Sequence, residues 1–260
     1  MNLQRLSRIP KRLRQDAEII TICKNWREIL QAKWSGSEYN KIIFRNGVIL
    51  ECPQEISLGF LFSEIWIDRV YNPPNYEIKE GDTIIDIGAN IGVFAIYAAT
   101  AAPNVTVYSY EPFPQNFAYL KKNVVESNLK NVKTNEKAVA NKVGERTLKI
   151  SHAWILHSLS DDNEESGMTV KCTTLNEILE DMPNCNMLKL DCEGGEYEIL
   201  YSCSPKNLAK IDKIVGEYHQ KDAEKMNGNS LCLFLKENNF RIDYFHSFNN
   251  HCGLICATKK

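Results

Sequence analysis

Short apolar runs rich in β-branched residues alternate along much of the chain with stretches of helix-forming residues. The clearest run, at residues 84–87, has three isoleucines and suits a strand covered on both faces. Residues 105–110 and 187–190 are runs of the same kind. Residues 94–100 are good helix formers between the first two runs, so they predict the crossover of a right-handed βαβ unit. The whole pattern predicts an α/β fold with a mostly parallel sheet.

The front of the chain departs from this alternation. Residues 1–35 predict helices, residues 41–51 predict a β-hairpin, and residues 57–71 carry apolar side chains at helical spacing. We therefore divide the chain into a cap or accessory region over residues 1–70 and a main domain over residues 71–260. From its position ahead of the first strand of the sheet, we expect the front region to pack beside the ligand crevice and help form the substrate site.

Two further segments complete the pattern. Apolar runs at residues 240–244 and 253–257 predict a closing antiparallel hairpin. Residues 141–172 form an insertion that we expect to be a loop with a solvated acidic tip. His152 and His157 in this insertion are candidate bases for a hydroxyl, although a lone loop histidine is more often simply exposed.

A glycine turn after the first strand carries the most informative chemistry. Its pattern is D-x-G-x-N-x-G, formed by Asp86, Gly88, Asn90 and Gly92. Glycines allow a ligand to approach the backbone closely, and an acid at the strand end suits a cation or a hydroxyl better than a phosphate. Asn90 stands where the dinucleotide fingerprint has its middle glycine, and the Lys-Ser or Lys-Thr of a phosphate loop is absent. The alternative is an ordinary strand-turn-helix of any α/β enzyme.

A second acidic position follows the next strand. Glu111 ends the run at residues 105–110, nineteen positions after Gly92. An acid about 20 residues beyond such a turn is placed to accept hydrogen bonds from a ribose diol. A solvated acid at a strand end is the alternative, and the glycine turn upstream favours the ribose role.

A third acidic turn follows the run at residues 187–190. Asp191 and Glu193 lie where a fourth parallel strand ends, and ligands of open α/β sheets bind outside the carboxyl ends of strands. Two carboxylates there can take a proton, hold a metal or bind a cationic methyl donor. Glu196 and Glu198 continue onto the next helix, where they also suit the helix dipole.

Together these segments resemble the FkbM family of S-adenosylmethionine-dependent methyltransferases. The segments that carry the likeness are residues 86–94, 110–117, 137–140, 174–175, 188–196 and 217–219. The most specific are the Glu-Pro-x-Pro-x-Asn-Phe stretch that begins at Glu111 and the Lys-x-Asp-x-Glu-Gly-x-Glu stretch that begins at Lys189. The resemblance implies a Rossmann-like class I fold with a seven-stranded, mostly parallel sheet that ends in an antiparallel hairpin.

The resemblance also implies S-adenosyl-L-methionine as the cofactor. Residues of the glycine turn would line its methionine end, namely Asp86, Gly88, Asn90 and Gly92. Glu111 would hold the ribose, and Phe113 would flank the adenine. Asp191 would also contact the cofactor.

The family transfers a methyl group, commonly to a hydroxyl oxygen of a sugar or polyketide. Four residues would face the reacting centre: Asp191, Glu193, Glu217 and His219. A hydroxyl acceptor needs a base, or a cation that lowers its pKa. We favour His219 or Asp191 as the base, and we assign no metal, although the carboxylates offer suitable oxygen ligands.

The amino-acid composition limits the kinds of partner that we expect the protein to bind. The chain has 260 residues with 43% hydrophobic residues, 25% charged residues and a net charge of −2, as in a soluble globular protein. This charge gives no general attraction to nucleic acid. No run is long enough for a membrane span, no secretory leader is visible, and the nine scattered cysteines suit reduced thiols, so we expect a cytoplasmic protein.

The basic start of the chain, with five Lys or Arg residues between Arg5 and Arg14, could touch a membrane surface or a partner. Such a run is more often a solvated face. The expected acceptor is a small-molecule or glycan hydroxyl. Two other classes stay open: a non-catalytic cofactor-binding module that partners a glycan-building enzyme, and an NAD-dependent oxidoreductase. The sequence indicates no oligomeric state.

Overall fold

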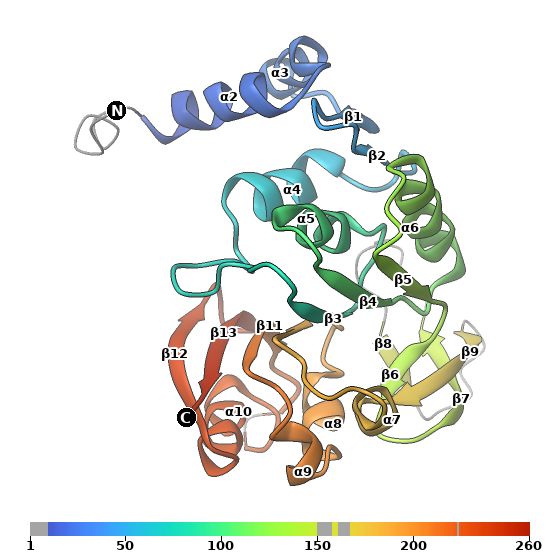
Figure 1. Ribbon diagram of the computed structural model, residues 1–260, viewed down its shortest axis with the longest axis vertical. Coiled ribbons are helices and arrows are strands. Elements are labelled where there is room, and N and C mark those ends of the chain that lie inside the picture. Colours follow the sequence, from blue (N-terminus) through green and yellow to red (C-terminus); the bar gives the residue numbers. More distant parts are fainter. Residues whose placement is uncertain (1–9, 150–157, 161–166, 223) are drawn as a thin grey trace.

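A seven-stranded sheet forms the centre of the computed structural model, which describes residues 10–149, 158–160, 167–222 and 224–260 (Figure 1). In their order across the sheet, the strands are β12 (Phe240–Ser247), β13 (Cys252–Lys259), β11 (Lys213–His219), β10 (Met187–Leu190), β3 (Thr83–Ile87), β4 (Thr106–Tyr110) and β5 (Val132–Asn135). Only β13 runs opposite to the others among these strands. The predicted class I methyltransferase fold with its closing hairpin is confirmed.

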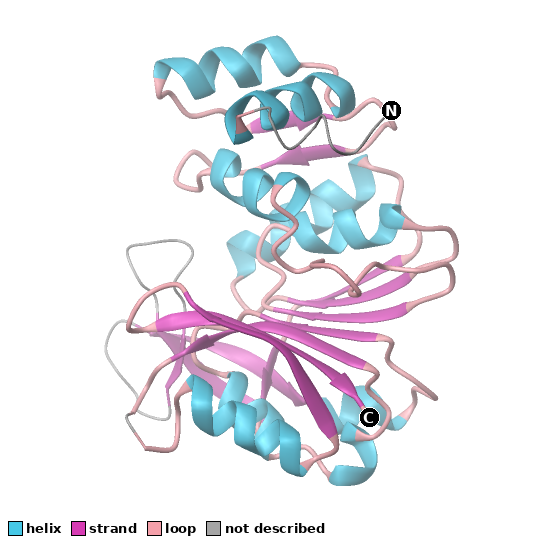
Figure 2. Ribbon diagram, turned by 90° about the vertical axis from the view of Figure 1, so that its left-hand side faces the viewer, coloured by secondary structure: helices cyan, strands magenta, loops and turns pink. Residues whose placement is uncertain are grey.

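Helices cover both faces of this sheet (Figure 2). The helices on one side are α4 (Leu58–Phe62), α5 (Val93–Ala101) and α6 (Pro114–Glu126), and those on the other are α7 (Leu175–Glu180), α8 (Glu196–Tyr201), α9 (Pro205–Leu208) and α10 (Gly228–Glu237). Successive strand residues point to opposite faces, so Ile84 packs in the core with α5 while Ile85 and Ile87 pack in the core with α8. This double burial explains why isoleucines of the strand at residues 83–87 occupy both of its faces.

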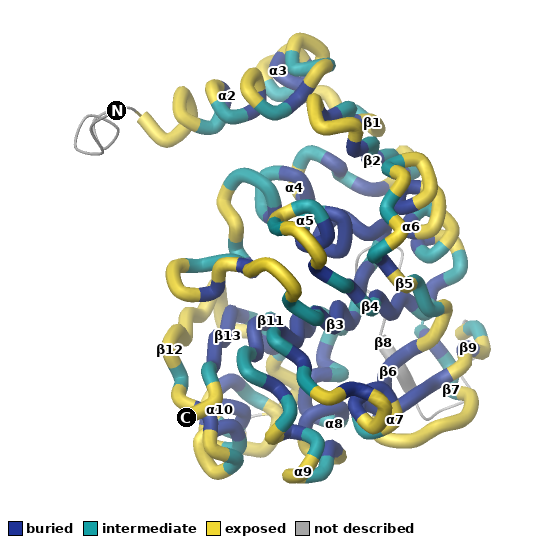
Figure 3. Tube along the Cα trace, viewed as in Figure 1, coloured by how far each residue is buried: buried dark blue, intermediate teal, exposed yellow. Residues whose placement is uncertain are grey.

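The front region packs onto the first of these helix layers. It contains helices α2 (Lys11–Ile22) and α3 (Trp26–Ser35), the predicted hairpin of β1 (Lys41–Ile43) and β2 (Ile49–Glu51), then α4 and a π-helix at Ser63–Ile67. Its buried side chains belong to the same hydrophobic cluster as α5, while the outer part of α2 is exposed (Figure 3).

The predicted contact of the basic start with a membrane or a partner stays a prediction, because residues 1–9 lie outside the described part of the chain. Among the residues that the structure describes, no helix is both long and apolar enough to cross a bilayer.

The insertion holds a second sheet rather than only a loop. The strands of this sheet, in order, are β6 (Ala138–Ala140), which precedes the insertion, β9 (Gly167–Thr174), β7 (Gly144–Lys149) and β8 (Ser158–Ser160). The prediction of a loop is wrong here: β7 and β9 expose polar residues between their buried ones, and these polar residues hide the strand pattern. His152 and His157 lie outside the described residues.

Asn123 of helix α6 ties the front region to the glycine turn. Its fully buried side chain accepts a hydrogen bond from the Glu51 backbone N–H at 2.8 Å. It also donates to the backbone carbonyls of Glu51 and Ile91, each at 2.9 Å. The side-chain amide of Asn123 thus provides hydrogen-bond partners for three backbone groups, and it connects segments that lie far apart in the sequence.

We predict that Asn123→Ala lowers the free energy of unfolding by about 2 to 3 kcal/mol, because it leaves backbone groups without hydrogen-bond partners. Denaturant unfolding of the full chain measures this change. Val125→Ala on the same helix is the control: its side chain is 69% exposed, so the expected change is within about 0.5 kcal/mol. Equal effects of the two substitutions would contradict the tie.

Candidate functional site

A cavity of about 590 Å³ lies at the carboxyl ends of β3, β4, β10 and β11. The front region contributes part of its wall, including Glu64 and Val70, and Tyr71 follows directly after it. The tip of the β12–β13 hairpin contributes Phe248 and Cys252. Parallel strands place their carboxyl ends at one edge, so side chains that follow different strands meet there. The expectation that the front region lies beside the crevice is confirmed.

The glycine turn forms one wall through a close backbone approach. Gly88 has φ +75°, and a Cβ added there would lie 1.7 Å from the carbonyl oxygen of Asp191, so no larger residue fits. Gly92 has φ +89° and its added Cβ would lie 2.5 Å from Leu120 Cδ1. Gly88 and Asn90 line the cavity, whereas Gly92 begins helix α5 and is outside the described cavity lining.

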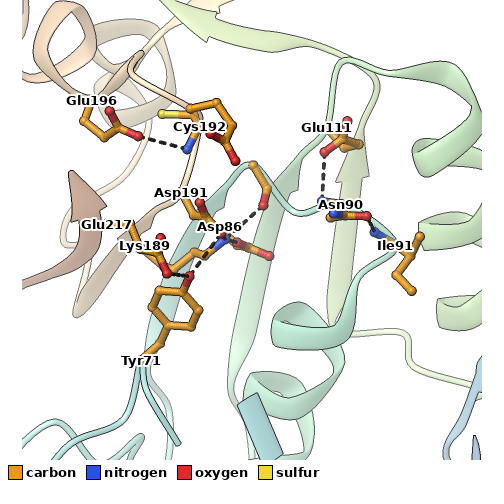
Figure 4. A network of polar contacts seen from close by, with 12 residues as sticks. Tyr71, Asp86, Asn90, Ile91, Glu111, Lys189, Asp191, Cys192, Glu196 and Glu217 are labelled. Carbon is orange, nitrogen blue, oxygen red and sulfur yellow. Dashed lines mark hydrogen bonds and ion pairs between the residues drawn. The ribbon is translucent and has the colours of Figure 1, made fainter. Parts of the chain in front are cut away.

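Glu111 lies in the same wall at the end of β4. Its carboxylate accepts a hydrogen bond from the backbone N–H of Asn90 at 2.8 Å (Figure 4). It also accepts one from the backbone N–H of Phe113 at 2.9 Å. Burial raises the pKa of Glu111 to about 7. Phe113 is buried against the insertion, in a cluster that includes Leu148 and Val170, and is outside the described cavity lining.

The buried ammonium of Lys189 contacts both the glycine turn and the acidic turn. Its Nζ lies 3.3 Å from Asp86 Oδ1 and 3.7 Å from Asp191 Oδ2, and it donates a hydrogen bond to the Gly88 carbonyl at 2.9 Å (Figure 4). Burial lowers the pKa of Lys189, but Asp86 and Asp191 raise it more, so the side chain stays protonated. Asp86 is fully buried and lies beside Lys189, and it is not among the described residues that line the cavity.

Tyr71 holds two carboxylates together at the opposite end. Its hydroxyl lies 3.0 Å from Asp191 Oδ2 and 3.0 Å from Glu217 Oε1. Burial, followed by the charges of Asp191 and Glu64, raises the pKa of Glu217 to about 7. Glu64 comes from the π-helix, and burial together with the charge of Asp191 raises its pKa to about 7 as well.

His219 is fixed between further carboxylates. Its Nδ1 lies 3.0 Å from Glu196 Oε1, so it donates to this fully buried carboxylate, and its Nε2 lies 3.4 Å from Glu193 Oε2. Burial lowers the pKa of His219, but the hydrogen bond and charge of Glu196, with that of Glu193, raise it to about 9. Burial raises the pKa of Glu193 to about 7.

Glu196 also organises the acidic turn itself. Its Oε1 accepts from the backbone N–H groups of Cys192 and Gly194, each at 3.2 Å. Within this turn Glu193 has φ +53°, a strained conformation for a residue with a side chain. Glu196 therefore does more than complement the helix dipole, as the sequence alone predicts: it fixes the turn and orients His219.

The structure thus brings the four predicted reaction residues into one cavity with Gly88, Asn90 and Glu111, and it places Asp86, Gly92 and Phe113 outside the described lining. Their individual roles stay predictions. Sequence reasoning missed Glu64 and Tyr71, and it gave Lys189 no role. A lysine inside the apolar strand at residues 187–190 was the available signal for Lys189. Nothing local marks Tyr71, whose partners are more than 100 residues away.

We predict that Asp86→Asn lowers the free energy of unfolding by about 3 to 5 kcal/mol, because it takes away the closest countercharge of a buried ammonium. Thermal or denaturant unfolding measures the change. The control is Glu18→Gln, which breaks the partly exposed pair with Arg69 at 2.8 Å and should cost less than about 1 kcal/mol. A similarly small effect of both changes would show that Lys189 does not depend on Asp86.

Comparison with known proteins shows the family to which the chain belongs. The model of the FkbM methyltransferase domain matches residues 86–242. The 31-O-demethyl-FK506 methyltransferase FkbM of Streptomyces tacrolimicus is 27% identical over 198 residues, which cover 63% of this chain and 75% of that protein. Methyltransferase 1 of Beauveria bassiana is 24% identical over 188 residues, covering 63% and 74%. The hexuronic acid methyltransferase AglP of Haloferax volcanii is 29% identical over 147 residues, covering 55% and 58%. The chain belongs to the FkbM family of methyltransferases.

Proposed function

We propose that this protein transfers the methyl group of S-adenosylmethionine to a hydroxyl oxygen of a sugar or secondary metabolite. The observation that carries the proposal is a single cavity with two different ends. One end offers Glu111 and the backbone of the glycine turn, and the other gathers Asp191, Glu217 and His219. A donor bound at the first end would present its reacting group to the second.

The first end fits the nucleoside of this cofactor. Glu111 is an acceptor for a ribose diol, and Gly88 leaves the backbone open where a Cβ would fill the space. Asn90 lines the cavity beside them. Asp86 would act indirectly, through the ion pair that holds Lys189 beneath the turn.

The second end fits the chemistry of a hydroxyl acceptor. S-adenosylmethionine, when bound, supplies a methyl group already activated on a sulfonium, so the protein's tasks are alignment and removal of the acceptor proton. We assign proton removal to the carboxylates of Asp191, Glu193 and Glu217, because His219, with a pKa of about 9, is protonated at neutral pH. Carboxyl groups with a pKa near 7 suit this task, because a base works best when its pKa lies near the working pH.

The names of the relatives support an oxygen acceptor. One is called a 31-O-demethyl-FK506 methyltransferase and another a hexuronic acid methyltransferase. Membership of a methyltransferase family weighs against an NAD-dependent oxidoreductase, as does Asn90 at the position of the middle glycine. A non-catalytic binding module would not need the clustered acids.

We predict that the affinity for S-adenosylhomocysteine falls as the pH is lowered through about 7. Glu111 must be ionised to accept from the ribose, and its pKa of about 7 means that it gains a proton below this value. Below the pKa the affinity should fall by up to about tenfold per pH unit. Calorimetric titration between pH 5.5 and 8.5 measures this, with NAD as a comparison ligand that should not bind.

Glu111→Gln is the matched variant. It should bind more weakly and lose the pH dependence, since it cannot ionise. Circular dichroism at each pH checks that both proteins stay folded. An unchanged affinity of the wild type across this range would contradict the role of Glu111.

We also predict that Asp191→Asn and Glu217→Gln slow methyl transfer by about 100-fold or more while S-adenosylhomocysteine still binds, because general-base catalysis contributes about this much. The assay follows a labelled methyl group into a panel of oligosaccharides and small hydroxyl compounds. The product should be an alkali-stable ether. An alkali-labile ester would instead indicate a carboxylate acceptor, and full activity of both variants would contradict the assigned centre.

A further inference from the structure

We infer that Asp191, Glu217 and His219 form a binding site for a divalent cation of the Mg²⁺ or Mn²⁺ type at the acceptor end of the cavity. One ligand atom of each residue lies within 4.8 Å of the others. Bonds of about 2.1 Å place adjacent ligands of an octahedral ion about 3 Å apart and opposite ligands about 4.2 Å apart. The three atoms must therefore move toward one another when an ion binds. This inference deepens the proposed function, and only the role of the ion rests on that function.

Tyr71 holds the two carboxylates in a geometry that a cation explains. Its side chain is 2% exposed, and its single hydroxyl proton faces both Asp191 Oδ2 and Glu217 Oε1 at 3.0 Å. One proton cannot satisfy two acceptors at once. Paired carboxylates repel each other, so they normally share a proton or a metal ion. The second oxygen of each carboxylate is left for such an ion.

The environment of His219 provides a separate observation. Glu196 lies outside the three ligands, is fully buried, and accepts from His219 Nδ1 at 3.0 Å. This leaves Nε2 as the ligand atom, 3.9 Å from Glu217 Oε2, and a bound cation would displace the proton that Nε2 carries in its absence. A histidine that binds a metal through one nitrogen usually donates its other N–H to a carboxylate in this way, which fixes the ring.

The charge around the three residues points the same way. Glu64 and Glu193 also line this end of the cavity. Among the described residues, six acidic and three basic side chains line the cavity. Of the basic ones, Lys189 lies 3.3 Å from Asp86, His219 lies between Glu196 and Glu193, and Lys221 lies beside Gly194. Negative charge is therefore in excess. The sulfonium of the donor is the other possible source of positive charge, so the test omits the donor.

The ligand types select the ion. Two carboxylate oxygens and one imidazole nitrogen, with open positions toward the cavity, suit Mn²⁺ better than Ca²⁺, which takes oxygen ligands. A bound acceptor hydroxyl in an open position would have its pKa lowered. Its O–H bond would then break with the electron pair left on oxygen, and the proton would pass to Glu193, which lines the same cavity.

The test is a titration of the chelator-treated full chain with Mn²⁺ alone, followed by the electron paramagnetic resonance signal of free Mn²⁺. The wild type should bind one ion. Asp191→Asn and Glu217→Gln should each weaken binding by more than about 10-fold, since even the outer partners of metal ligands typically contribute that much. Glu64→Gln is the matched control: it removes a charge from the same cavity without removing a ligand, so it should weaken binding far less.

Absence of Mn²⁺ binding by the wild type would overturn the inference, and so would equal weakening by Glu64→Gln and the two ligand variants. Titration of each protein with S-adenosylhomocysteine shows whether it is folded and keeps the two proposals apart. A protein that binds S-adenosylhomocysteine but not Mn²⁺ would refute the cation site alone. A protein that binds Mn²⁺ but not S-adenosylhomocysteine would refute the cofactor assignment alone.

Discussion

The rest of the site depends on the ion pair and the hydrogen bond that the buried ammonium of Lys189 makes. It joins β10 to β3 through Asp86 and holds the glycine turn through the Gly88 carbonyl (Figure 4). The rings of Tyr71 and Phe94 lie 5.2 and 5.9 Å from it and keep it from water. Without this charge, Asp86 would be a buried acid with no countercharge, and the close approach of the turn to Asp191 would lose its support.

The cavity is completed by segments beyond the part that defines the family. The family model matches residues 86–242, whereas Glu64 and Tyr71 precede this range and Phe248 follows it. The matched part supplies the glycine turn, Glu111 and the acidic turn, which are the groups assigned to the donor and to the reaction. The unmatched segments cover the end of the cavity that we propose for the acceptor.

Local sequence patterns predicted the parts of this molecule that local physics determines. Ile84, Ile85 and Ile87 revealed a doubly buried strand, and the glycines after it revealed the turn, because both signals lie within a few residues. The parts that sequence reasoning missed depend on distant contacts. Tyr71 meets Asp191 across 120 positions, and no periodicity encodes that meeting. The strands of the insertion were missed because their exposed faces are polar.

A crystal structure of the protein with bound S-adenosylhomocysteine tests the central claim most directly. The account predicts the ribose hydroxyls within hydrogen-bonding distance of the Glu111 carboxylate, and the sulfur directed toward the end of the cavity that holds Asp191, Glu217 and His219. Adenosine bound at the acidic end, or a ribose without contact to Glu111, would contradict it.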